Sequence, residues 1–289
     1  MQVRPGLRFL HNSVYDAPPL IPSINSLIQL SPAFQLRSTY ARGFRSPALR
    51  ELYFVFFDSN HSIQGNENLK AEHSNSFNSY LSYEQELGGG HYFRSSIGGF
   101  YNIFDNLITT GVSPENGSIT TYLNIDHFKT TGIVWENNYT YKQLSASLGF
   151  SYLGRYNRLK EDFNDTDRFL WTPEVNASIF YDFPRIGMDV NLFYKFYGKR
   201  PNYEAVTDED GTVRARSTMI SAFHQADLTV NKRITNYLTL NAGIRNLLDV
   251  TNLTSNATVG EGAHNEASSS IPMSFGRSYF LGLQFNLTR

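Results

Sequence analysis

The sequence contains no cysteine among its 289 residues. This absence excludes disulfides, thiolate metal sites and cysteine nucleophiles. It fits a cytosolic protein, and it equally fits an exported protein for which stray disulfides would hinder folding. Cysteine content therefore excludes several kinds of site without fixing the compartment.

Long apolar runs are also absent. No stretch approaches the roughly 18 to 20 apolar residues that a helix needs to cross a bilayer, which excludes a helical membrane protein. The first residues, MQVRPGLRFLHN, contain no basic start followed by a continuous apolar segment, so they do not read as a signal peptide. We therefore expect that the protein stays inside the cell or that its beginning has been removed.

Charge of either sign is sparse and balanced. Charged residues make up 18% of the chain, the formal net charge is −1, and Lys and Arg are scattered. A nucleic-acid-binding surface needs clustered basic residues, and the sequence offers none. The same scatter excludes a polybasic membrane tag.

Aromatic residues are abundant, at 15% of the chain, with 18 Tyr and 22 Phe. They favour strands, and the surrounding sequence alternates between apolar and polar residues with a period of two. In LSASLGFSYLG (144–154), for example, one face carries Leu, Ala, Leu, Phe and Tyr while the other carries Ser, Ser, Gly and Ser. Such alternation predicts strands with one apolar and one polar face. About twelve strands and no required helix are predicted, near 2–11, 20–30, 33–44, 73–87, 91–108, 118–141, 144–156, 169–182, 187–198, 222–234, 238–249 and 275–288.

The connections between these strands alternate in length. Tight turns are predicted at 31–32, 88–90, 142–143, 184–186 and 235–237, and long polar loops near 45–72, 109–117, 157–168, 199–221 and 250–274. Short periplasmic turns opposite long extracellular loops are typical of outer-membrane barrels. The pattern thus favours an all-β, transmembrane, antiparallel up-and-down barrel whose apolar strand faces meet lipid. The alternative is a soluble β protein whose apolar faces pack together.

One stretch resembles the signature of TonB-dependent outer-membrane receptors. STYARGFRSPALRELYF (38–54) is followed by GNENLKAEHSNSF (65–77), which is similar to the family's strand end, its Glu-Leu-Tyr and the opening of its next strand. Stretches 101–109, 240–249 and 275–287 also resemble family strands, in the right order. The motif residues are Gly43, Phe44, Arg45, Pro47, Glu51, Leu52, Tyr53, Gly65, Asn66, Asn68, Leu69, Lys70 and Glu72.

The resemblance implies a larger protein, with more barrel strands than this chain has and with a plug. Receptors of this family are similar to 22-stranded barrels whose lumen holds an N-terminal plug, and the plug carries the TonB box that engages TonB. Residues 1–289 would then be the C-terminal part of such a barrel, about 12 of its 22 strands, with the plug absent. The implied function is TonB-dependent uptake across the outer membrane of a Gram-negative bacterium. The implied cargo is an iron-siderophore, haem or cobalamin, with a glycan or peptide also possible.

The loop at 45–72 is the candidate ligand-binding segment. It holds the aromatic run YFVFF (53–57), and at a barrel mouth such rings would pack on a bulky apolar ligand while polar neighbours offer hydrogen bonds. Packing of the cluster within its own loop is the simpler alternative, and rim salt bridges are the simpler role for its charges. The candidate ligand-binding residues are Arg45, Phe54, Phe56, Phe57 and His61.

Signatures of catalysis are missing from the sequence. It has no GxSxG, no HExxH and no phosphate-binding Gly loop, so an enzyme is not expected, and neither is a cofactor. The histidines are spread over different predicted strands and loops. Two acidic runs, EDFNDTDR (161–168) and TDEDG (207–211), have oxygen ligands for Ca²⁺ without EF-hand spacing, so we interpret them as solvated loops.

Two other classes of function stay open from the sequence alone. A complete twelve-stranded barrel, acting as a passive pore or autotransporter translocator, would explain the even strand count. A soluble all-β ligand-binding module would explain the aromatic residues, and it predicts purification without detergent. Extra encoded residues that include a plug would favour the receptor.

Overall fold

A computed structural model describes residues 1–58, 62–112, 119–158, 169–207, 213–255 and 270–286. Within these residues the dominant feature is one 14-stranded sheet, in which β4 and β5 lie off the main path and leave twelve strands along it. The path is β1-β2-β3-β6-β7-β8-β9-β10-β11-β14-β15-β18, and each neighbouring pair is antiparallel. This is the up-and-down order that the alternation predicts.

The twelve strands on the path match the twelve predicted ones. Several run for 15 to 22 residues, well above the five or six that are usual in globular proteins. Their bounds are β1 Gln2–Phe9, β2 Leu20–Gln29, β3 Phe34–Arg45, β6 Glu72–Gly88, β7 His91–Val112, β8 Thr120–Tyr141, β9 Leu144–Arg158, β10 Leu170–Phe183, β11 Met188–Tyr197, β14 Phe223–Arg233, β15 Leu238–Arg245 and β18 Ser278–Phe285.

The predicted long loops contain regular structure that the sequence analysis missed. The expectation that no helix is needed is wrong at one place, a five-residue helix α1 (Leu49–Tyr53), whose N-terminal turn is stabilised by Glu51. Six further short strands lie in predicted loops: β4 Val55–Phe57, β5 Ser62–Gln64, β12 Arg200–Thr207, β13 Val213–Ile220, β16 Asn252–Thr254 and β17 Ser270–Pro272. Among the described residues no helix is long and apolar enough to cross a membrane.

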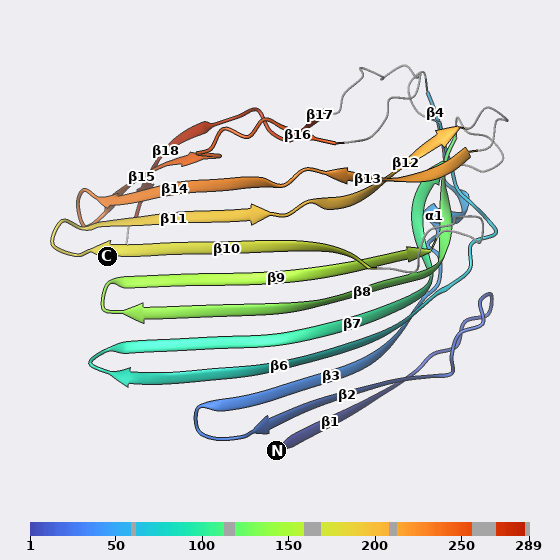
Figure 1. The fold of residues 1–289 in the computed structure, drawn as a ribbon, viewed down its shortest axis with the longest axis horizontal. Helices are drawn as coiled ribbons and strands as arrows, with labels where there is room; N and C mark the ends of the chain where they lie inside the picture. The colour runs from blue at the N-terminus through green and yellow to red at the C-terminus, as the bar shows by residue number, and fades with distance from the viewer. Residues whose placement is uncertain (59–61, 113–118, 159–168, 208–212, 256–269, 287–289) are drawn as a thin grey trace.

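The short turns all lie at one end of the sheet and the long connections at the other, as Figure 1 shows. Backbone conformation explains two of the tight turns. Gly88, Gly89 and Gly90 have φ of +82°, +60° and +82°, which a residue without Cβ adopts at little cost. Lys142 has φ +51° in the connection between β8 and β9. Strand ends are thus brought together by turns of the kind that hairpins require.

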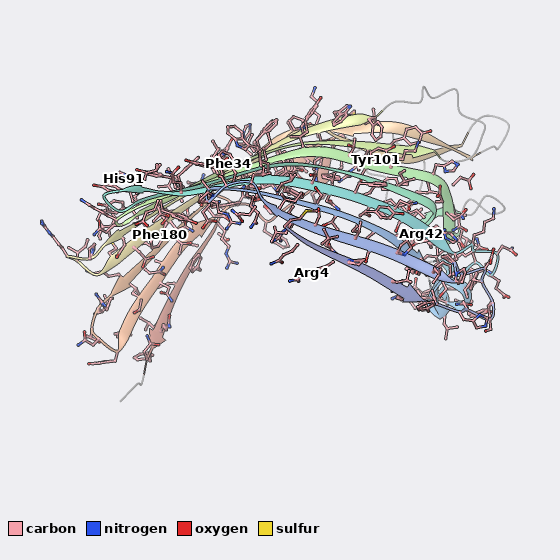
Figure 2. All side chains as sticks on the ribbon, turned by 90° about the horizontal axis from the view of Figure 1, so that it is seen from below. Arg4, Phe34, Arg42, His91, Tyr101 and Phe180 are labelled. Atoms are coloured by element: carbon pink, nitrogen blue, oxygen red, sulfur yellow. The ribbon has the colours of Figure 1, made fainter. Side chains whose placement is uncertain are left out.

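The sheet is curved into an arch with two chemically different faces. Figure 2 shows Arg4 and Phe180 under the arch, on its concave side, and Phe34 above it. Because side chains alternate along a strand, the cross-strand register extends these two faces over the whole sheet. Ser147 pairs with Ser178 on the concave side, whereas Leu148 pairs with Ala177 on the convex side.

The convex face carries large apolar side chains, and no second layer among the described residues covers them. Leu148 is 48% exposed, Leu192 is 40% exposed and Leu283 is 59% exposed. A soluble sandwich would bury such residues against a second sheet, and water would penalise their exposure by about 25 cal/mol per Å² of apolar surface. The face therefore matches the lipid-facing surface of a transmembrane barrel, as the sequence predicts.

Buried apolar residues instead gather near the end of the sheet that carries the long loops. Leu52 of α1 is 8% exposed, Leu69 is 3% exposed, Ala71 is 7% exposed and Ile125 of β8 is 5% exposed. Three of the four lie in or beside the signature stretch. That stretch thus builds a small apolar core under the loop between β3 and β6.

Candidate functional site

An arginine with two carboxylate partners fastens the base of this loop. Arg45, the last residue of β3, donates from Nε and Nη2 to Glu72, at 2.6 and 2.8 Å, and from Nη1 to both carboxylate oxygens of Glu51, at 3.0 and 2.9 Å. Glu72 also accepts from the backbone N–H of Ile108 at 2.7 Å. We call Arg45, Glu51 and Glu72 the clamp, since it ties β3, α1, β6 and β7 together.

The clamp holds Glu51 in its charged form. Burial alone would raise the pKa of this carboxyl, but hydrogen bonds from Arg45 and from the backbone N–H of Ala48 outweigh burial and lower the pKa below its ordinary value of 4.5. Hydrogen bonding to an ionised carboxylate favours that form. Glu51 is therefore a fixed negative partner for Arg45 at neutral pH.

A close backbone approach at Gly65 forms a second fastening. A Cβ at this position would lie 2.5 Å from the carbonyl oxygen of Leu52, a distance that only glycine tolerates. The approach lets the Gly65 N–H donate to the Phe54 carbonyl at 2.6 Å and the Asn66 N–H donate to the Glu51 carbonyl at 2.9 Å. The glycine of the signature thus closes the loop onto α1.

Two asparagines attach this closed loop to the barrel strands. The Asn66 side chain donates to the Tyr122 carbonyl of β8 at 2.9 Å. The Asn124 side chain accepts from the Lys70 N–H at 2.8 Å and donates to the Lys70 carbonyl at 3.1 Å. Nothing in the sequence around Asn124 singles it out, because its partner lies 54 positions away and only the fold brings them together.

The aromatic run forms a small exposed hairpin above this base. β4 pairs with β5, and β5 adds to β8 in parallel through Ile63 and Gln64. The rings of Phe54 and Phe56 lie on the same side with centroids 6.2 Å apart, and the Arg50 guanidinium lies 4.9 Å from the Phe54 ring. Phe56 is 43% exposed and Phe57 is 53% exposed. The hydrogen-bonded base of the loop therefore presents exposed aromatic rings at the long-loop end of the sheet.

The structure brings some of the predicted ligand-binding residues together and separates others. Phe54 and Phe56 share one side of the hairpin, while Phe57 alternates to the other. Arg45 lies below them in the clamp, where Glu51 and Glu72 engage its nitrogens. His61 lies outside the described residues, as do the whole 161–168 acidic run and residues 208–211 of the other run.

A cluster of cations and aromatic rings was missed by the sequence analysis. Tyr197 and Phe223 stack with centroids 4.5 Å apart, at the long-loop ends of β11 and β14. The Arg200 guanidinium lies 5.6 and 5.5 Å from these two rings, and Lys195 Nζ lies 4.3 Å from Tyr197. Arg200 Nε is buried and has no hydrogen-bond partner among the described residues. This cluster offers a spare donor beside aromatic faces, which suits an anionic or aromatic ligand.

The concave wall is hollowed next to this cluster. A cavity of about 370 Å³ lies over Gly149 and is bordered by Glu136, Asn176, Glu174 and Lys195. Lys195 Nζ and Glu174 form an ion pair at 3.4 Å. No group of three or more potential metal ligands occurs within the described residues. The wall thus offers charged and amide groups for hydrogen bonding.

Comparison with known protein families decides the identity of this barrel. Residues 2–247 match the family model described as TonB dependent receptor-like, beta-barrel. The chain belongs to the TonB-dependent receptor family. Membership confirms the resemblance seen in the signature stretch, and it places the protein in the outer membrane of a Gram-negative bacterium.

Relatives of this TonB-dependent receptor chain are iron-related proteins by name. The iron-regulated outer membrane virulence protein of Vibrio cholerae is 27% identical over 259 residues, which cover 84% of this chain and 38% of the relative. The ferric enterobactin receptor of Pseudomonas aeruginosa, solved with enterobactin, has a TM-score of 0.66 at 22% identity, covering 98% of this chain and 43% of that one. The FrpB iron transporter of Neisseria meningitidis has a TM-score of 0.64 at 16% identity, covering 92% and 39%.

These relatives are longer than the receptor chain described here, which spans about two fifths of their length. The solved structures share its fold. Family membership and the uncovered apolar face together favour the receptor over the soluble binding module and over the passive pore or autotransporter. Members of the family are receptors and transporters, not enzymes.

Proposed function

We propose that the intact protein takes up an iron-siderophore by TonB-dependent transport across the outer membrane. Family membership is the observation that carries this proposal, and the iron-related names of the V. cholerae, P. aeruginosa and N. meningitidis relatives support iron as the cargo. Haem and cobalamin are the next candidates, followed by a glycan or a peptide. The protein transports its ligand and does not transform it.

In this proposal two surfaces at the long-loop end receive the ligand. The hairpin rings of Phe54, Phe56 and Phe57 pack on its apolar parts, and His61 of the same loop offers a polar contact. Arg45 acts from below, since its hydrogen bonds fix the loop that carries the rings. The Arg200 cluster supplies a cation and a buried N–H donor for a negatively charged chelate.

Energy coupling in this proposal depends on parts that lie outside the chain. A plug with a TonB box would occupy the concave side of a 22-stranded barrel, where the polar wall around Glu174 and Lys195 offers hydrogen-bonding groups. TonB would remodel this plug with energy from the inner-membrane proton gradient. Ligand binding outside would then be followed by release inward.

The test is uptake of iron-loaded siderophores by cells that depend on this receptor. We expect the triple variant Phe54→Ser, Phe56→Ser, Phe57→Ser to lower uptake about a hundredfold or more, because the three rings together provide apolar contact with the ligand worth about 3 kcal/mol. Uptake by the unmodified receptor should also vanish in a strain without TonB.

Tyr237→Ser provides the matched control. Tyr237 is 57% exposed but lies in the tight turn between β14 and β15, at the opposite end of the sheet, so its loss should leave uptake unchanged. Normal uptake by the triple variant would refute the ligand role of the rings. Uptake that persists without TonB would refute active transport by this protein.

A further inference from the structure

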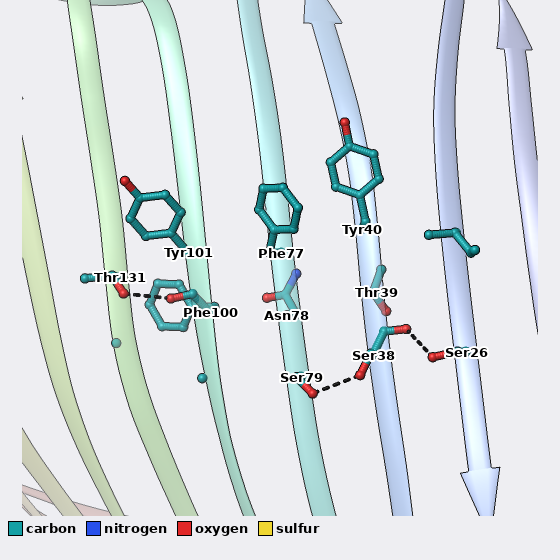
Figure 3. Close-up of a pocket in the computed structure, with 13 residues that line it drawn as sticks. Ser26, Ser38, Thr39, Tyr40, Phe77, Asn78, Ser79, Phe100, Tyr101 and Thr131 are labelled. Carbon is teal, nitrogen blue, oxygen red and sulfur yellow. Dashed lines mark hydrogen bonds between the residues drawn. The ribbon is translucent and has the colours of Figure 1, made fainter.

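The convex face is hollowed at one place between β2 and β8. The hollow has a volume of about 560 Å³, and Figure 3 shows the side chains that border it. The cross-strand pairing places most of its lining residues on the same face of the sheet as the lipid-facing residues. They include Ile24, Ser38, Ser79, Gly99 and Tyr101. It therefore opens toward the bilayer and not toward the lumen. We call it the convex groove.

Small residues in one cross-strand row create the convex groove. Ser26 pairs with Ser38, Ser38 with Ser79, and Ser79 with Gly99. Their hydroxyls are already engaged, since Ser26 donates to the Ser38 carbonyl at 3.4 Å and the Ser38 and Ser79 hydroxyls are 2.9 Å apart. The serine hydroxyls at the base of the convex groove are thus hydrogen-bonded within the sheet, so this base can contact hydrocarbon without leaving polar groups unpaired.

Aromatic rings border the groove on the side of the long loops. Tyr40 and Phe77 lie with ring centroids 4.8 Å apart, and Tyr101 follows on the next strand opposite Phe77. Aromatic residues of barrels are enriched at the level where acyl chains meet headgroups. The rings therefore indicate that the groove lies just inside the hydrocarbon of the outer leaflet.

Two cations stand beyond these rings, on the same face. Arg42 is two residues beyond Tyr40, and Lys129 is two residues beyond Thr131, with Nζ 5.2 Å from the ring of Tyr156 on the adjacent strand. Neither cation forms an ion pair with another described residue. The nearby carboxylate of Asp105 is bound to His127 at 2.8 Å. β3 and β8 are separated by three strand spacings, about 14 Å, so one ligand that binds both cations needs two anionic groups about this far apart.

We propose that the convex groove is a binding site for a phosphorylated lipid of the outer leaflet. Its acyl chains lie in the groove, and its phosphates bind Arg42 and Lys129. Charge complementarity selects an anionic headgroup, because neither cation has a carboxylate partner within the part of the chain that the structure describes. The serine hydroxyls at the base of the groove are already hydrogen-bonded, so this base favours hydrocarbon. The lipid would brace β8 and the three strands that the clamp joins, β3, β6 and β7.

The test measures lipid that stays bound to the intact protein purified from membranes. Delipidated protein is incubated with a diphosphorylated glucosamine-based lipid, and bound lipid is counted by native mass spectrometry. We expect the double variant Arg42→Gln, Lys129→Gln and the groove-filling variant Ser79→Leu each to lower retention about threefold or more. Removing the phosphates from the lipid should lower its retention by the unmodified protein to a similar extent.

Matched controls separate the site from general effects. Ala146→Leu enlarges a convex-face residue on β9 away from the groove, and Arg185→Gln removes an exposed cation at the opposite rim; both should retain lipid normally. Heat-modified migration on gels confirms that each variant is folded. Equal retention by all variants, equal binding of the dephosphorylated lipid, or displacement by inorganic phosphate alone would overturn the proposal.

Discussion

Single residues fix the position of the loop that carries the candidate ligand contacts. Gly65 permits a backbone approach that no side chain would allow, and Asn124 holds both backbone groups of Lys70. On the loop side these contacts are made by main-chain atoms, so the side chains of the loop are not needed for them. The signature GNENLK is accordingly explained as a structural fastening and not as a set of ligand contacts.

Gly65→Ala tests this explanation. The added Cβ would meet Leu52 backbone atoms at about 2.5 Å, and overpacking of this kind costs about 1–3 kcal/mol. We expect amide exchange at Asn66 and at Lys70 to accelerate about tenfold, measured by hydrogen–deuterium exchange. Gly282→Ala is the control, since the nearest heavy atom to its Cβ would be 4.0 Å away. Unchanged exchange in Gly65→Ala would contradict the account.

At the scale of elements, the clamp joins β3, α1, β6 and β7 through one arginine. Its strength depends on two ionised carboxylates, because a protonated Glu51 loses the charge that pairs with Arg45. The free energy that this pairing contributes is greatest when both partners are charged. The elements at the loop base are therefore coupled through a titratable group.

The clamp should weaken in acid. Glu51 has a lowered pKa in the folded protein, so the stability that it contributes is present above the ordinary pKa of 4.5 and is lost as the pH falls through the folded value. We expect proteolysis in the 46–71 loop to accelerate as the pH drops further below the ordinary pKa of 4.5. Arg45→Gln should show fast proteolysis already at pH 7 and no further acid step. An acid step of the same size in Arg45→Gln would exclude the clamp as its cause.

The main strands could be predicted because alternation is a local signal. Elements that lack it were missed: α1, with the sequence LRELY, is a short helix of mixed polar and apolar residues, β4 lies in the consecutive apolar run 53–57, and β12 and β13 pair with each other outside the main sheet. The predicted ends of strands were wrong where the backbone has positive φ angles. The predicted strand 238–249 ends at Arg245, since Asn246 and Asp249 have φ of +52° and +60°, and Gly276, with φ +90°, delays the start of the last strand to Ser278.

Candidate binding residues were harder to predict because they depend on long-range pairing. The Phe54 and Phe56 rings stand out as a local aromatic run, whereas Tyr197, Arg200 and Phe223 meet only through the pairing of β11 with β14. The Arg45 ion pairs with Glu51 and Glu72 confirm the rim salt bridges that were the simpler expectation for the charges of this loop. Sequence reasoning from a single chain has no comparable signal for the Arg200 cluster.

At the largest scale, the described residues form an arch whose convex face meets lipid and whose concave face is polar. The cross-strand register carries each face across twelve strands, so one misplaced strand would reverse the chemistry of its surface. Absence of cysteine makes this arrangement directly measurable, because a single introduced thiol can carry a spin label without competition from another thiol in this chain.

The decisive measurement is a spin-label scan of β9 at residues 145–150, with the protein in lipid bilayers and collisions measured for oxygen and for a polar nickel complex. Labels at Ala146→Cys, Leu148→Cys and Phe150→Cys should collide strongly with oxygen, which concentrates in hydrocarbon, while Ser145→Cys, Ser147→Cys and Gly149→Cys should show weak oxygen collisions. The account predicts this period of two. Uniform values along the strand, or strong oxygen collisions at the odd positions, would contradict it.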